Sequence, residues 1–138
     1  MSAALIYIHG FNSSPASFKA RVLQSALAQR APALSFTAPA LPHSPQAAAC
    51  LLDELVAANP GVVLVGSSLG GYYATWLAER HALRAVLVNP AVRPYELLEG
   101  HIGRQKICIP ARNTISRPRM SPNCAHLNAR QLRRNIIC

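Results

Sequence analysis

Four short stretches of the chain are almost wholly apolar. They read ALIYIHG (residues 4–10), LSFTAPAL (34–41), GVVLVG (61–66) and RAVLVNPA (84–91), and the second is the weakest of the four. A short run that is apolar on both faces is typical of a strand inside a sheet that helices cover on each side. We therefore expect four buried strands.

The segments between these runs have apolar positions at helical spacing. Ser14 is expected to cap a first helix and Pro15 to open it, with an inward stripe of Phe18, Val22, Leu23 and Leu27. Ser44 is expected to cap a second helix over residues 45–59, whose apolar face comprises Ala48, Leu51, Leu52, Leu55 and Val56. Residues 69–82, LGGYYATWLAERHA, predict a third helix.

Strands that alternate with helices predict βαβ units, a parallel sheet and an α/β fold of three layers. The pattern ends after Arg104, because the remaining residues contain several prolines and no sustained period. We expect an incomplete α/β core over residues 1–105 and a basic, irregular or disordered tail over residues 106–138.

The charge composition of the chain also changes near residue 105. The net charge is +9, and residues 106–138 carry seven of the 14 lysines and arginines but none of the five acids. The first residues lack the basic and apolar parts of an export signal, and no run reaches the ~20 apolar residues that cross a bilayer. The four cysteines have neither metal-ligand nor disulfide-framework spacing. These features predict a cytoplasmic protein without a metal or cofactor.

The sequence GSSLGG lies between the third apolar run and the third helix. Only one register gives Gly-x-Ser-x-Gly, with Gly66, Ser68 and Gly70, and this setting is typical of a nucleophile elbow. Side chains two residues either side of the serine would collide with so tight a turn, so glycine is needed there. We expect a strained backbone that lifts the Ser68 hydroxyl above the sheet, and we interpret Ser67 as a small turn residue.

Acyl transfer also needs donors aimed at the oxyanion of the transition state. In an α/β-hydrolase one donor is the amide after the nucleophile, here Leu69, and the other comes from the loop after an earlier strand, here Phe11. His9, Gly10 and Asn89 are expected to line the pocket. For His9 we favour a structural role, in which hydrogen bonds of its ring hold the loop.

Three segments together carry a family resemblance. LIYIHGFNSSPASFKA, GSSLGGYYATWLAE and VNPAVRPYELL resemble the YqiA-type esterases, small bacterial α/β-hydrolases, over about residues 3–105. The resemblance implies that Ser68 is the nucleophile and that Phe11 and Leu69 form the oxyanion hole. It also implies hydrolysis of a carboxylic ester or acyl thioester, and a sheet in which the four expected strands take the order second, first, third, fourth.

The partners of such a serine are not evident. This fold takes its acid and then its histidine from later in the chain than the serine, and no segment matches the family there. Glu79 and His81 are expected to face solvent, and Asp53 precedes Ser68. A replacement triad of Ser68, Glu96 and His126 is an alternative.

Two hypotheses concern residues 106–138. The first is that they are an out-of-frame reading of the gene, because one codon choice read in another frame gives a segment that resembles the family. The second is that they bind nucleic acid or an acidic surface. For the chain as a whole, a further possibility is an inert hydrolase-like fragment.

The segment RAVLVN is the last expected strand. Without later strands to pair with it, this segment would leave an apolar sheet edge open to self-association.

Overall fold

A computed structural model describes residues 3–91 of the chain. Four strands, β1 (Ala4–Ile8), β2 (Ser35–Thr37), β3 (Val63–Ser67) and β4 (Ala85–Val88), alternate with three helices, α1 (Phe18–Arg30), α2 (Pro45–Ala57) and α3 (Leu69–His81). Every strand pair is parallel, and the order in the sheet is β2-β1-β3-β4. The predicted α/β class, parallel sheet and strand order are confirmed.

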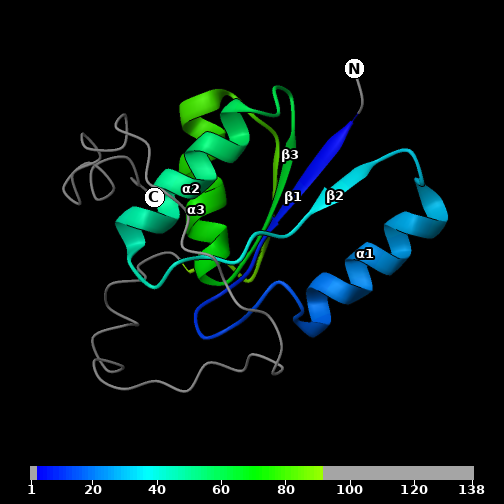
Figure 1. Ribbon diagram of the computed structural model, residues 1–138, viewed down its shortest axis with the longest axis horizontal. Helices are drawn as coiled ribbons and strands as arrows, with labels where there is room; N and C mark the ends of the chain where they lie inside the picture. The colour runs from blue at the N-terminus through cyan, green and yellow to red at the C-terminus, as the bar shows by residue number, and fades with distance from the viewer. Residues whose placement is uncertain (1–2, 92–138) are drawn as a thin grey trace.

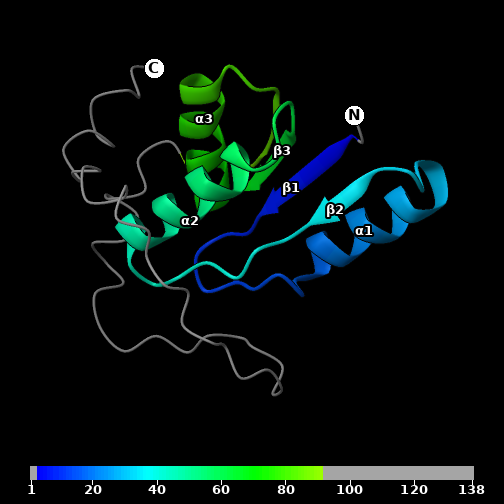
Figure 2. The ribbon, with the colours of Figure 1, turned by 45° about the horizontal axis from the view of Figure 1, so that its top comes forward.

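The three helices lie in two layers. Helices α2 and α3 cover one face of the sheet and α1 lies on the other (Figure 1, Figure 2). Side chains alternate between the two faces of a strand, so Ile6 and Leu64 contribute to the α2–α3 side while Tyr7 and Val65 contribute to the α1 side.

The α2–α3 side holds the larger core. Its buried residues come from the sheet, from the segment before β3 and from both helices: Ile6, Ile8, Ala48, Ala49, Leu52, Val56, Val62, Leu64, Tyr73, Ala74, Trp76 and Leu77. Ser44 caps α2 as predicted, and its hydroxyl accepts a hydrogen bond from the Ala47 amide. Burial raises the pKa of Tyr73 to about 12, with a smaller contribution from Tyr72.

The buried cluster on the α1 side is much smaller. It consists of Leu5, Tyr7, Ala20 and Val65, with Leu23 and Leu27 of α1 packed partly against it. The predicted stripe is therefore half wrong, because Phe18 is 77% exposed and Val22 is 51% exposed. Residues 20, 23 and 27 share the face of α1 that meets the sheet, and residues 18 and 22 lie away from it.

The start of α1 also differs from the prediction. Ser17, rather than Ser14, caps the helix, since its hydroxyl accepts from the Ala20 amide. Ser14 is instead used in a preceding turn, in which its carbonyl oxygen accepts from the Ser17 amide at 3.0 Å. Pro15 lies in that turn, three residues before the helix begins.

Strand β4 pairs with β3 and has no further partner among the described strands. Val86, Leu87 and Val88 are exposed, in agreement with the expected apolar edge. Self-association through that edge stays a prediction. Glu96, His126 and residues 106–138 lie outside the described residues, as do the hypotheses about them.

Candidate active site

The structure contains the strained bend expected at Ser68. Ser68 connects β3 to α3 with φ 54° and ψ −120°, a backbone conformation that side chains rarely adopt. Its amide donates to the Val88 carbonyl oxygen at 3.1 Å, and its carbonyl oxygen accepts from the Gly71 and Ala91 amides. The residue is exposed, and its hydroxyl makes no capping hydrogen bond to α3. The fold thus holds a serine in strain at the carboxyl edge of the sheet.

Close backbone contacts explain the two elbow glycines. A Cβ atom on Gly66 would lie 2.3 Å from the Gly70 carbonyl oxygen, and one on Gly70 would lie 1.9 Å from the Ile8 carbonyl oxygen. No side chain fits at either distance. A Cβ atom on Gly71 would lie 2.7 Å from Cβ of Pro90, so this third glycine lets α3 approach the segment after β4.

The candidate oxyanion donors are Leu69, directly after this bend, and Phe11, in the β1–α1 connection. Leu69 is the first residue of α3, where the backbone amides of a helix lack partners within the helix. Phe11 is exposed and follows β1 in a turn. Gly10, just before it, contacts the serine: a Cβ atom built there would lie 3.1 Å from Ser68 Cβ and 3.6 Å from its hydroxyl oxygen. The β1–α1 connection therefore approaches the Ser68 hydroxyl directly.

His9 is buried and uses both of its ring nitrogens. The Leu41 amide donates to Nε2 at 3.3 Å, so Nδ1 carries the proton and donates to the Gly10 carbonyl oxygen at 2.9 Å. Burial lowers the pKa of His9, and the Gly10 hydrogen bond opposes this more weakly. The favoured structural role of His9 agrees with these contacts, which join the β1–α1 connection to the segment after β2.

Asn89 follows β4 directly, is exposed, and adopts a left-handed conformation with φ 51°. It lies next to Val88, whose carbonyl oxygen accepts from the Ser68 amide. This position is at the same edge of the sheet as Ser68. The assignment of Asn89 to the pocket stays a prediction.

Ser67 has a partner that the sequence did not reveal. It is the last residue of β3, is only 4% exposed, and its hydroxyl accepts from Lys19 Nζ at 3.3 Å. The two residues are 48 positions apart, and no local pattern links a lysine in the first turn of α1 with a strand end.

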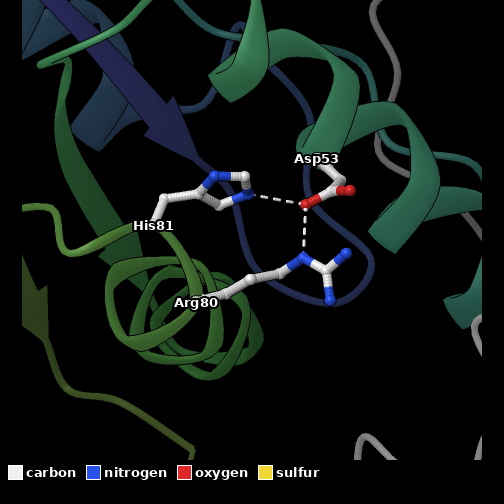
Figure 3. Close-up of polar contacts among 3 residues, drawn as sticks. All are labelled: Asp53, Arg80 and His81. Atoms are coloured by element: carbon white, nitrogen blue, oxygen red, sulfur yellow. Dashed lines mark hydrogen bonds and ion pairs between the residues drawn. The ribbon is translucent and has the colours of Figure 1, made fainter.

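Asp53, Glu79 and His81 lie away from Ser68. Glu79 is exposed, as expected. The expectation for His81 is wrong, because it is half-buried and its Nε2 lies 2.7 Å from Asp53 Oδ1. Arg80 Nε lies 3.0 Å from the same oxygen, so one carboxylate of α2 binds two side chains of α3 (Figure 3). His81 is the last residue of α3, whereas Ser68 precedes the first residue of that helix.

The described residues contain no group of three or more potential metal ligands. None of the helices among them has the length and apolar character needed to cross a membrane.

The chain matches the model of a protein family over residues 4–134. That family is described as "Uncharacterised protein family (UPF0227)". The chain belongs to the UPF0227 family. Its elbow and parallel sheet are consistent with a hydrolase-like fold. The matched range includes most of residues 106–138, so the boundary at residue 105 stays a prediction.

Curated members of UPF0227 are similar to the chain. The YcfP protein of Escherichia coli O139:H28 is 30% identical over 103 residues, which cover 72% of this chain and 57% of YcfP. A UPF0227 protein of Citrobacter koseri matches to the same extent. A member from Shewanella sp. strain ANA-3 is 38% identical over 47 residues, covering 34% of this chain and 26% of that protein. The chain therefore matches little more than half the length of YcfP.

Proposed function

We propose that the chain carries the nucleophile and oxyanion-hole part of a serine hydrolase that acts on carboxylic esters or acyl thioesters. The observation that carries the proposal is the conformation of Ser68. An exposed serine with φ 54°, at the end of a buried parallel strand and the start of a helix, costs conformational energy that a plain turn would avoid. Such strain is typical of functional sites, and the nearby helix N-terminus favours developing negative charge.

In the proposed reaction, Ser68 Oγ attacks the acyl carbon of the substrate and its proton passes to a water molecule. The carbonyl oxygen takes up negative charge and accepts hydrogen bonds from the Leu69 and Phe11 amides. Collapse of this intermediate breaks the bond to the alcohol or thiol, which leaves with the proton. Water then hydrolyses the acyl-serine bond, which releases the acid and restores the hydroxyl.

A serine hydroxyl needs a base to accept its proton, and no histidine of residues 3–91 is hydrogen-bonded to Ser68. Of the three histidines in residues 3–91, His9 is bonded through both nitrogens and His81 is paired with Asp53 at the far end of α3. His43 is exposed between β2 and α2 and makes no hydrogen bond to Ser68. We therefore expect slow turnover. An oxyanion hole and binding without a working triad leave on the order of 10³–10⁴-fold acceleration over the uncatalysed reaction.

The test is hydrolysis of a matched pair of short-chain substrates, a p-nitrophenyl ester and the corresponding aryl thioester, by the full chain and by Ser68→Ala. We expect slow hydrolysis that the substitution abolishes. Rates that are equal for both proteins and equal to the buffer rate would contradict the proposal and favour an inert fragment. Fast hydrolysis that depends on Ser68 would mean that a residue other than His9 and His81 supplies the base.

A further inference from the structure

The first serine of GSSLGG, Ser67, is not an ordinary turn residue. Ser67 is buried at the end of β3, and its hydroxyl accepts from Lys19 Nζ. Val65, two residues earlier on the strand, belongs to the cluster on the α1 side. The Ser67 hydroxyl therefore faces α1, whereas Ser68 leaves the sheet in the bend.

The segment between β1 and α1 lies close to these two serines at its start and is followed by a residue that is hydrogen-bonded to Ser67. At its start, a Cβ atom built on Gly10 would lie 3.3 Å from the Ser67 carbonyl oxygen and 3.1 Å from Ser68 Cβ. At its end, Lys19 lies in the first turn of α1 and bonds Ser67. Along the chain, Phe11, the candidate oxyanion donor, lies between Gly10 and Lys19.

The hydrogen bond between Lys19 and Ser67 is not needed merely to hold α1 on the sheet. The helix already contacts the sheet through Ala20, Leu23 and Leu27, and alanine at position 67 would avoid burying a hydroxyl that needs a partner. A buried hydroxyl without its partner costs more than the hydrogen bond itself gains. The pair also joins the first turn of α1 to the residue that directly precedes Ser68.

We propose that Lys19, acting through Ser67, is a positioning residue that holds the Phe11 amide in register with the Ser68 hydroxyl. This inference rests on the proposed function, in which Phe11 and Leu69 donate to the oxyanion. Donors contribute most when they are already in place as charge develops, so a looser connection slows acylation and leaves substrate binding nearly unchanged.

The experiment compares Lys19→Met, Ser67→Ala and the double variant in the full chain. The matched control is Arg21→Met, which removes the same charge from the same helix. Two readouts are used: the kcat and KM of Ser68-dependent ester hydrolysis, and the amide exchange rates and NMR shifts of Gly10, Phe11 and Leu69. We expect about a tenfold loss of kcat with unchanged KM in each single variant, and no further loss in the double variant.

The same three variants should speed amide exchange at Gly10 and Phe11. The conservative variant Lys19→Arg should restore most of kcat. The control Arg21→Met should have the kcat and the exchange rates of the parent. Additive losses, equal effects of Lys19→Met and Arg21→Met, or unchanged exchange at residues 10–12 would overturn the positioning role. If the parent does not react through Ser68, the proposed function fails on its own, and the exchange rates still decide whether Lys19 and Ser67 hold the connection.

Discussion

The two faces of the sheet differ in how they are held together. The α2–α3 side buries large side chains from β1, β3 and both helices, and its contacts with the elbow glycines leave no space for a Cβ atom. The α1 side has a cluster of four buried hydrophobic residues and exposes Phe18 and Val22. The difference suggests that the strain at Ser68 is supported mainly from one side, while the β1–α1 connection depends on a few polar contacts.

The largest expected effect is at Gly70. Substitution Gly70→Ala places a Cβ atom 1.9 Å from the Ile8 carbonyl oxygen, so β1 and α3 cannot both keep their positions. We expect a loss of about 4 kcal/mol or more in the free energy of unfolding, or an insoluble product. Circular dichroism followed during urea unfolding measures the free energy of unfolding of the variant and the parent.

The matched control is Gly61→Ala. Gly61 has φ 79°, and a Cβ atom built there meets no atom within 4 Å, so only backbone strain of about 1 kcal/mol is expected. Equal losses at the two glycines would contradict the tight approach of β1 to α3.

A pair of leucines compares the two faces directly. Leu64 is fully buried on the α2–α3 side and Leu5 belongs to the α1 side, on the neighbouring strand. Leu64→Ala should lower the free energy of unfolding by about 4 kcal/mol and Leu5→Ala by about 2 kcal/mol, because a cavity costs more where the surroundings are packed more fully. Urea unfolding of both variants measures the difference. The reverse order would contradict the unequal support of the sheet.

A smaller effect is expected from pH, through His9. Burial lowers the pKa of His9 in the folded protein below its usual value of 6.5. As the pH falls below about 6.5, the unfolded chain binds a proton that the folded chain does not. The free energy of unfolding should therefore decrease until the pH passes the lower, folded-state pKa, and level off below it.

His9→Gln should reduce this dependence, while the exposed His43→Gln should keep it. Chemical unfolding from pH 7.5 to pH 5 measures the slopes. An unaltered slope in His9→Gln would show that another group causes the dependence.

Strong local patterns predicted the parts of the fold that local forces fix. The apolar runs predicted the strands, and Ser44 predicted the start of α2. The Gly-x-Ser-x-Gly spacing predicted the bend at Ser68, because few conformations connect a buried strand to a helix in so few residues.

The prediction of α1 was less successful. Ser14 and Ser17 are both reasonable caps, and residues 18 and 22 have helical spacing as good as that of residues 20, 23 and 27. Only packing against the sheet decides which set of residues faces inward. The pairs of Lys19 with Ser67 and of Asp53 with His81 join distant positions, so no local period could indicate them.

The most direct test of the account is to treat the full chain with a fluorophosphonate and to locate the adduct by peptide mass spectrometry. The account predicts a slow but specific adduct on Ser68, none on the neighbouring Ser67, and no labelling of Ser68→Ala at either position. An unlabelled Ser68, or an adduct that persists on Ser67 in the Ser68→Ala variant, would contradict the claim that the strained bend makes one hydroxyl reactive.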